Sequence, residues 1–227
     1  MSLSTRASDV VRRAIDIVVA AVFLVVFSPV LFVVAVVIAA GLGRPVLFRQ
    51  RRPGLHGRAF TLVKFRTMLD VDERRGLITD ADRLTGLGRV LRATSLDELP
   101  TMWNVLRGEM SLVGPRPLLM RYLDLYTPEQ ARRHLVRPGV TGLAQVRGRN
   151  GLSWNDRLAL DVWYVDHRSL ALDAWICVRT ALILVRRDGI AAPGESTMPE
   201  FTGTTPLGGP TPLGGPTPLG GKEKESA

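Results

Sequence analysis

Two adjacent carboxylates, Asp97 and Glu98, lie near the start of a dense motif, Ser95–Pro117, in a chain whose other charges are mostly arginine. A carboxylate can attack phosphorus to form an acyl phosphate, and a pair of carboxylates can hold a divalent cation. An acidic pair in so basic a protein indicates a site that handles anions with a nucleophile or a metal, rather than a plain anion-binding surface.

Such a pair needs positive charge nearby, because two like charges about 4 Å apart repel by roughly 4 kcal/mol at an effective dielectric constant near 20. Arginine forks bind phosphate oxygens in a bidentate manner, and prolines on both sides of Arg116 limit its freedom. A divalent ion could supply the remaining charge. The candidate arginines before, inside and after the motif are Arg92, Arg116, Arg147 and Arg149.

A purely structural role for the pair is the alternative. Ser95-x-x-Glu98 matches a capping box, in which Ser95 caps a helix, Glu98 is its reciprocal partner and Asp97 is a first-turn carboxylate. Pro100 fits this interpretation poorly, since a fifth helical residue needs its backbone donor. The local pattern alone leaves both interpretations open.

Composition narrows the class of protein. The chain has 227 residues, is 46% hydrophobic and carries a net charge of +9, which fits phosphate-bearing ligands, anionic lipid or nucleic acid equally well. The single cysteine, Cys177, excludes an internal disulfide and agrees with a reducing compartment. The three histidines, His56, His134 and His167, have no metal-ligand spacing, so a zinc site is not expected.

A stretch of 26 residues without charge, from Ile17 to Leu42, predicts a membrane segment. Ser28 and Pro29 interrupt it near its middle, where proline removes a backbone donor and the serine hydroxyl can bond back to a carbonyl. Each half is roughly 18 to 21 Å long at about 1.5 Å per residue, short of the roughly 30 Å hydrocarbon core. We therefore expect the helix to break at Ser28–Pro29.

Basic residues flank this segment on both sides, which by the positive-inside rule holds both ends in the cytoplasm. A re-entrant hairpin that enters one leaflet and returns satisfies this requirement, whereas a kinked transmembrane helix remains the alternative. The flanking residues are Arg6, Arg12 and Arg13 before the segment and Arg44, Arg49, Arg51, Arg52 and Arg58 after it.

The remaining pattern predicts a mostly α protein with a small β-hairpin, an α+β fold. Short strands are expected at 46–48 and 59–65, a surface helix or loop at 70–85, and helices at 100–107, 118–126, 128–135, from 153 onward and at 171–187. The last helix is amphipathic, and fits either the membrane surface or the domain core. The predicted parts are an N-terminal segment with the membrane hairpin (1–43), a catalytic domain (44–195) and a flexible Pro/Gly-repeat tail (196–227), which is excluded from the fold.

Five segments in this order closely resemble the bacterial sugar transferase family, the monotopic polyprenyl-phosphate phosphoglycosyl transferases. The resemblance covers about residues 8 to 190 and includes the broken anchor. The segments are Lys64–Met68, Ser95–Pro100, Trp103–Pro117, Arg137–Gly142 and Gln145–Asn150.

The resemblance implies a two-step reaction at the cytoplasmic face of the bacterial inner membrane. Asp97 would attack the β-phosphate of a nucleoside diphosphate sugar, usually a UDP-sugar, releasing UMP and leaving a phosphosugar on the aspartate. Undecaprenyl phosphate would then attack this intermediate to give the polyprenyl-diphosphate sugar. The family's cofactor is Mg²⁺, with Glu98 as the expected ligand and Asp97 close by.

The resemblance also assigns the surrounding residues. Arg92, Arg116, Lys64 and Arg149 correspond to positions that bind the substrate phosphates, and Pro115, Pro117, Arg147 and Asn150 to the nucleotide or substrate pocket. The expected partners are therefore a UDP-sugar, undecaprenyl phosphate and the bilayer, without nucleic acid. The sugar, the pathway and the oligomeric state, a homodimer included, stay open.

Two other functions compete with this one. A membrane-attached protein that grips anionic lipid or nucleic acid through its arginines would use Asp97 and Glu98 only as a helix cap. A Mg²⁺-dependent hydrolase of lipid diphosphates would use the same carboxylates without a covalent intermediate. The first predicts that Asp97→Asn keeps function, and a phosphosugar trapped on Asp97 excludes the second.

Overall fold

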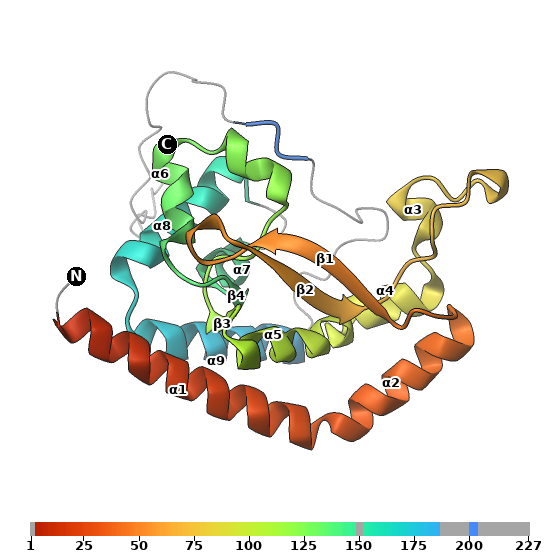
Figure 1. Ribbon diagram of the computed structural model, residues 1–227, viewed down its shortest axis with the longest axis horizontal. Helices are drawn as coiled ribbons and strands as arrows, with labels where there is room; N and C mark the ends of the chain where they lie inside the picture. The colour runs from red at the N-terminus through yellow and green to blue at the C-terminus, as the bar shows by residue number, and fades with distance from the viewer. Residues whose placement is uncertain (1–2, 149–151, 187–199, 204–227) are drawn as a thin grey trace, which may run out of the picture.

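The computed structural model describes residues 3–148, 152–186 and 200–203, with the side chains of 3–6 excepted. The described part of the chain is mostly helical and contains a small antiparallel hairpin, as the sequence predicted, together with a second small sheet (Figure 1). The α-helices are α1 (Leu3–Val26), α2 (Ser28–Gly41), α3 (Asp80–Arg83), α4 (Gly86–Ala93), α5 (Met102–Arg107), α6 (Pro128–Ala131), α7 (Leu143–Gly148), α8 (Trp154–His167) and α9 (Leu170–Arg186). The 3₁₀ helices are η1 (Leu55–Gly57), η2 (Glu73–Arg75), η3 (Leu96–Thr101), η4 (Met120–Leu125) and η5 (Arg132–Leu135), and the strands are β1 (Leu47–Pro53), β2 (Ala59–Phe65), β3 (Ser111–Val113) and β4 (Gly139–Thr141).

The predicted hairpin is present as the antiparallel pair β1–β2, in which Phe48 lies opposite Lys64 and Pro53 opposite Ala59. The first strand is longer than predicted, because it continues through the charged run 49–52. Alternation of hydrophobic residues could not reveal this part, since all four residues of the run are polar, and Arg49, Gln50 and Arg52 line a cleft.

A second sheet was missed. β3 and β4 pair in parallel, with Ser111 opposite Gly139 and Val113 opposite Thr141. Each strand has only three residues, too few to show a period of two, and the partners are far apart in the sequence.

The predicted helices are found with changed boundaries. Segment 100–107 begins as the 3₁₀ helix η3 with Pro100 inside it, and only α5 is α-helical, ending at Gly108 with φ of 82°. The helix expected at 118–126 is the shorter 3₁₀ helix η4, and 128–135 divides into α6 and η5. The helix predicted from Ser153 is α8, whose Ser153 side chain accepts from the backbone of Asp156.

The apolar N-terminal segment breaks where the sequence predicted. α1 and α2 are bent by 61° around Phe27, the Ser28 hydroxyl donates to the carbonyl of Val25 at 2.8 Å, and Pro29 lies in the first turn of α2. Among the described helices, none alone has the length and apolar character needed to cross a bilayer, whereas this bent pair passes the same test as a pair.

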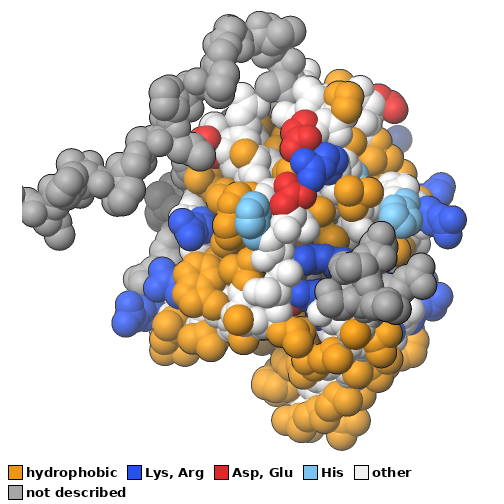
Figure 2. Space-filling view, turned by 90° about the vertical axis from the view of Figure 1, so that its left-hand side faces the viewer, with side chains coloured by type: hydrophobic (Ala, Val, Ile, Leu, Met, Phe, Trp, Pro, Cys, Tyr) orange, Lys and Arg blue, Asp and Glu red, His pale blue; other side chains and the backbone are white. Residues whose placement is uncertain are grey.

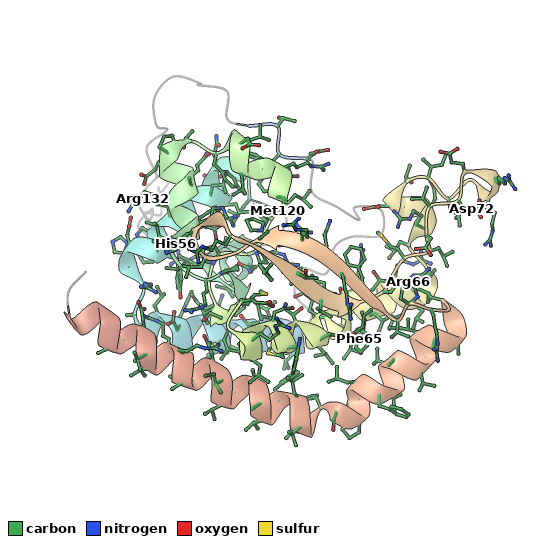
Figure 3. The ribbon with its side chains drawn as sticks, in the orientation of Figure 1. His56, Phe65, Arg66, Asp72, Met120 and Arg132 are labelled. Carbon is green, nitrogen blue, oxygen red and sulfur yellow. The ribbon has the colours of Figure 1, made fainter. Side chains whose placement is uncertain are left out.

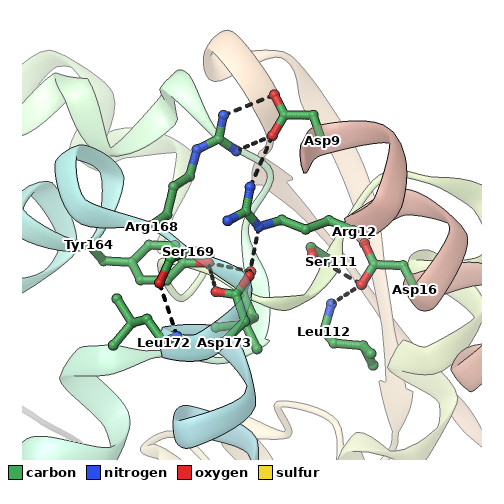
Figure 4. A network of polar contacts seen from close by, with 11 residues as sticks. Asp9, Arg12, Asp16, Ser111, Leu112, Tyr164, Arg168, Ser169, Leu172 and Asp173 are labelled. Atoms are coloured by element: carbon green, nitrogen blue, oxygen red, sulfur yellow. Dashed lines mark hydrogen bonds and ion pairs between the residues drawn. The ribbon is translucent and has the colours of Figure 1, made fainter. Parts of the chain in front are cut away.

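The first half of α1 is bound to the rest of the molecule by the polar network of Figure 4. Arg12 Nε donates to Asp173 of α9 at 2.7 Å, and Asp173 also accepts from the hydroxyl of Tyr164 at 2.6 Å. Asp9 pairs with both Arg12 and Arg168, and Asp16 accepts from the backbone of Leu112 at 2.9 Å. These contacts hold α1 against α8, α9 and β3.

The underside of the molecule, formed by α1, α2 and α9 in Figure 1, exposes many apolar side chains, and Figure 2 shows hydrophobic side chains gathered along the lower edge of one face. Val25 of α1 is 74% exposed, Phe32 of α2 is 70% exposed and Val185 of α9 is 82% exposed. On its other side α9 packs on the core through the fully buried Ile176, which confirms the core-packing interpretation of this helix. A contiguous apolar surface of this kind is typical of a docking face.

The exclusion of everything after residue 195 from the fold is wrong for Phe201. This side chain is 3% exposed and packs with Leu118, Tyr122 and Leu158. A single aromatic residue beside a Pro/Gly repeat gives no periodic signal. The repeat itself lies outside the described residues.

Candidate functional site

The acidic pair lies in the 3₁₀ helix η3 and does not form a capping box. Ser95, which precedes η3, adopts a left-handed backbone conformation (φ 56°) and makes no side-chain cap hydrogen bond. This conformation costs a non-glycine residue about 1–2 kcal/mol. The structural alternative for the pair is therefore wrong, because Glu98 reaches away from Ser95 toward cations of other elements.

Two side chains fix η3 and α5 to the free edge of β2. The hydroxyl of Thr101 donates to the carbonyl of Val63 at 3.1 Å, while the Asn104 amide accepts from the Val63 backbone at 3.1 Å and donates to the carbonyl of Thr61 at 2.7 Å. They satisfy the edge backbone groups that a third strand would otherwise pair. Since β2 also carries Lys64, this junction sets the acidic pair beside that lysine.

Glu98 is held by two cations. Its Oε1 accepts from Lys64 Nζ at 2.6 Å and from an Arg116 guanidinium nitrogen at 2.7 Å. These short contacts are charge-assisted hydrogen bonds, which are stronger than neutral ones. Residues 34 and 18 positions away in the sequence thus meet at one carboxylate oxygen.

Arg92 reaches the site from α4. Its Nε donates to the hydroxyl of Thr67 at 3.1 Å, just after β2. α4 comes this close because Gly88 packs against the Thr67 carbonyl, where an added Cβ would lie only 1.9 Å from the oxygen. Only glycine fits at this position of the helix.

The two carboxylates have opposite pKa shifts. Burial and the charge of Glu98 raise the pKa of Asp97 to about 6, against the lowering influence of Lys64, Arg92 and Arg116. Burial also acts to raise the pKa of Glu98, but the charges and hydrogen bonds of Arg116 and Lys64 outweigh it and hold that pKa below its ordinary value. Glu98 is therefore a fixed anion, whereas Asp97 is the more basic carboxylate of the pair.

A cleft of about 2940 Å³ opens over the site. Its walls include five of the predicted site residues, Lys64, Arg92, Asp97, Glu98 and Arg116. The lining also reaches apolar residues of the helices at the underside, Phe23 of α1, Ala39 of α2 and Leu184 of α9. One continuous hollow thus connects the charged centre with the helices of the apolar underside.

The lobe 66–85 forms one side of the cleft and projects from the body of the molecule (Figure 3). Arg66 fixes its base, since its guanidinium donates to the carbonyls of Met68 and Arg44 and to Asp70. The expected surface helix or loop consists of η2 and the single-turn helix α3, joined by isolated β-bridges.

The donor set fits a magnesium ion that shares its coordination with substrate. Among the described residues no group of three or more His, Cys, Asp or Glu side chains could hold a metal. Mg²⁺, however, is commonly held by one or two carboxylates together with water and substrate phosphates. Asp97 makes no side-chain hydrogen bond within the described residues, while one oxygen of Glu98 is already bound to two cations. Asp97 is thus the freer ligand.

The other predicted residues lie in different places. Pro115 and Pro117 are buried on either side of Arg116 and are not among the described residues that line the cleft. Arg147 is also absent from those walls and places its guanidinium 5.8 Å from the centre of the Trp175 ring. Arg149 and Asn150 lie outside the described residues.

Sequence reasoning missed several residues of the cleft wall, among them Arg52, Thr67, Tyr122 and Arg157. Arg52 was interpreted only as part of the basic flank of the membrane segment. Its neighbour Arg51 is exposed, so an alternation of facing positions within β1 was the available signal. Arg157 lies on α8, 60 residues after Asp97, where no local pattern connects it to the site.

Comparison with known proteins identifies the family. Residues 7–187 match the bacterial sugar transferase family. The chain is 50% identical over 198 residues to the "Uncharacterized sugar transferase EpsL" of Bacillus subtilis, covering 86% of this chain and 97% of that protein. It is 44% identical over 197 residues to the "UDP-glucose:undecaprenyl-phosphate glucose-1-phosphate transferase" of Caulobacter vibrioides, covering 80% of this chain and 72% of that protein.

A longer relative is the "Undecaprenyl-phosphate galactose phosphotransferase" of Salmonella typhimurium, 35% identical over 206 residues, which cover 83% of this chain and 43% of that protein. The chain belongs to the bacterial sugar transferase family and is a phosphoglycosyl transferase.

Proposed function

We propose that this enzyme transfers a sugar 1-phosphate from a UDP-sugar to undecaprenyl phosphate through an intermediate covalently bound to Asp97, and that it releases UMP. The observation that carries the proposal is the placement of a buried, relatively basic Asp97 beside Glu98, Lys64, Arg92 and Arg116 in one cleft. The named relatives from Caulobacter and Salmonella act on undecaprenyl phosphate, which supports this acceptor.

In the first step a carboxylate oxygen of Asp97 attacks the β-phosphorus of the UDP-sugar. The bond from this phosphorus to the bridging oxygen breaks, and UMP leaves with that oxygen and the electron pair. Lys64, Arg92 and Arg116 face the negative charge that develops on the phosphate oxygens. Glu98 fixes Lys64 and Arg116 in place, since both donate to its Oε1.

In the second step a phosphate oxygen of undecaprenyl phosphate attacks the same phosphorus. The bond from phosphorus to Asp97 breaks, which restores the carboxylate and gives the undecaprenyl-diphosphate sugar. Bound Mg²⁺, held by Asp97 or Glu98 together with the phosphates, would neutralise part of their charge. The apolar part of the cleft beside α1, α2 and α9 suits the lipid chain of the acceptor.

The test is a panel of UDP-sugars offered to the purified enzyme with undecaprenyl phosphate and Mg²⁺, with UMP release as the readout. We expect one or a few sugars to release UMP, and removal of Mg²⁺ with a chelator to suppress the reaction. If no member of the panel gives UMP while lipid diphosphates are hydrolysed, the enzyme is a hydrolase and the proposal is wrong.

A second part of the proposal is that α1 and α2 form a re-entrant hairpin at the cytoplasmic face of the inner membrane. The break at Phe27 and the apolar underside shared with α9 support it. A catalytic domain held at headgroup level would meet the UDP-sugar from water and the lipid phosphate within the leaflet.

Cysteine accessibility tests this topology. In a Cys177→Ser background, Ala7→Cys lies before the apolar segment and Arg58→Cys in the exposed β1–β2 turn. We expect a membrane-impermeant maleimide to label both cysteines in inside-out vesicles and neither in right-side-out vesicles. Labelling of the two positions from opposite sides would show a spanning helix instead.

A further inference from the structure

Arg52 of β1 is a cation of the cleft to which the mechanism above gives no task. The Nε of Arg52 is buried without a hydrogen-bond partner. A terminal nitrogen of the same guanidinium donates to the Gln50 side chain at 2.6 Å. Within the described residues it forms no ion pair. A buried guanidinium nitrogen without an acceptor is costly, unless a ligand supplies that acceptor.

The electrostatic surroundings of Arg52 are unfavourable for a cation. Burial and the positive charge of Arg116 lower the pKa of Arg52 to about 10. Arg116 in turn interacts with Glu98 and Asp97, and also with Arg157 of α8. Arg116 therefore interacts both with the acidic pair and with the arginines Arg52 and Arg157, and all of these residues line the same cleft.

The charge balance of the cleft indicates that these arginines bind an anionic ligand. Lys64 and Arg116 both form ion pairs with Glu98, so part of their positive charge is neutralised before any substrate binds. A sugar nucleotide brings two linked phosphate groups, and only one of them reacts at Asp97. A phosphate group presents several anionic acceptor oxygens, which arginine forks bind in a bidentate manner.

We propose that Arg52, with Arg116 and Arg157, forms a second phosphate subsite beside Asp97, which grips the phosphate next to the one that reacts. The inference rests on the proposed function for its place in the reaction. Two molecules carry a suitable phosphate: the nucleotide, whose α-phosphate leaves with UMP, and the polyprenyl phosphate acceptor.

Direct binding provides the first test and does not depend on turnover. UDP is titrated into the wild-type enzyme and into the Arg52→Gln, Arg52→Lys and Arg51→Gln variants in the same detergent. Arg51 is the matched control, because it is the adjacent arginine of β1, is exposed and does not line the cleft. We expect Arg52→Gln to weaken UDP binding about 10- to 100-fold, Arg52→Lys to weaken it less, and Arg51→Gln to leave it unchanged.

The two half-reactions identify the source of the phosphate. The covalent intermediate is loaded from a UDP-sugar and then discharged either with UMP or with undecaprenyl phosphate. Slower loading and slower discharge by UMP assign the subsite to the nucleotide, whereas slower discharge by the lipid alone assigns it to the acceptor. The subsite is refuted if Arg52→Gln, folded as judged by an unchanged melting temperature, matches Arg51→Gln in UDP binding and in both half-reactions.

The Arg52→Lys variant keeps the test decisive if Arg52→Gln does not fold, because lysine retains the positive charge and most of the side chain. If Arg52→Gln unfolds, the same measurements are made on Arg52→Lys, which loses the bidentate guanidinium contact, and the proposal is overturned if this variant equals the wild type in UDP affinity and in both half-reactions. A wild-type enzyme that binds UDP but forms no covalent intermediate would instead show that the proposed function has failed, while the binding comparison still decides on the subsite.

Discussion

Replacement of Asp97 by asparagine is expected to abolish the covalent intermediate and to lower UMP release by at least about 10³-fold. Asparagine keeps the size of the side chain but has no anionic oxygen to attack phosphorus. The measurement is intact-protein mass spectrometry after addition of a UDP-sugar, which detects the added phosphosugar on the wild type. Loss of the adduct in Asp97→Asn with full UMP release would exclude this residue as the nucleophile.

The same replacement is expected to stabilise the metal-free protein at alkaline pH. The pKa of Asp97 is about 6 in the fold, against 3.8 for the free side chain, so the folded state binds the proton more tightly than the unfolded state. Ionised Asp97 therefore opposes folding above pH 6, by up to about 3 kcal/mol, and this effect disappears below about pH 4. Asp97→Asn should melt higher than the wild type at pH 8, and the difference should shrink on acidification.

The pH dependence separates this effect from ordinary changes in packing. Glu98, Lys64, Arg92 and Arg116 surround Asp97 and are the same in both proteins. An exposed carboxylate of η4, Asp124, provides the control, because Asp124→Asn should change neither the melting temperature nor the adduct. A stability difference between Asp97→Asn and wild type that is equal at pH 8 and pH 5 would contradict the assigned pKa.

Some parts of the candidate site could be predicted from the sequence, and others could not. The acidic pair was recognisable because two carboxylates among arginines are unusual in any context. Its local pattern, Ser95-x-x-Glu98, pointed to a capping box, which the structure replaces by ion pairs with Lys64 and Arg116. Charge-assisted hydrogen bonds from distant residues outweigh a neutral local cap.

The sequence pattern could not predict which distant residues meet in the folded protein. Thr101 and Asn104 are ordinary polar residues in the sequence, and their role at the edge of β2 depends on where that edge lies. The sequence analysis explained Arg52 only as one of the basic residues that flank the apolar segment and set its membrane topology. The hairpin, the break at Ser28–Pro29 and the helix from Ser153 were predictable because alternation, proline and capping act over a few residues.

Replacement of Arg133 by methionine is expected to give the largest loss of stability, about 3–5 kcal/mol. Arg133 is 2% exposed and donates twice to Asp161 of α8, at 2.6 and 3.1 Å. Its removal leaves the buried Asp161 carboxylate without its cation. Arg133 also donates to the carbonyl of Arg116 at 2.8 Å, so the variant should bind UDP more weakly as well. Chemical denaturation measures the first effect and titration with UDP the second.

The neighbouring residue offers a matched control for this prediction. Arg132 forms ion pairs with Glu129 and Asp166 at the surface, and Arg132→Met should cost less than about 1 kcal/mol. Burial already raises the pKa of Asp161 against the influence of Arg133, so its unpaired carboxyl will take up a proton more readily in Arg133→Met. The destabilisation should therefore be smaller at pH 5 than at pH 8, and Arg133→Met combined with Asp161→Leu should recover much of the loss. A loss that is independent of pH and persists in the double variant would mean that packing of the Arg133 side chain, rather than its charge, holds η5 against α8 and keeps Arg116 in place.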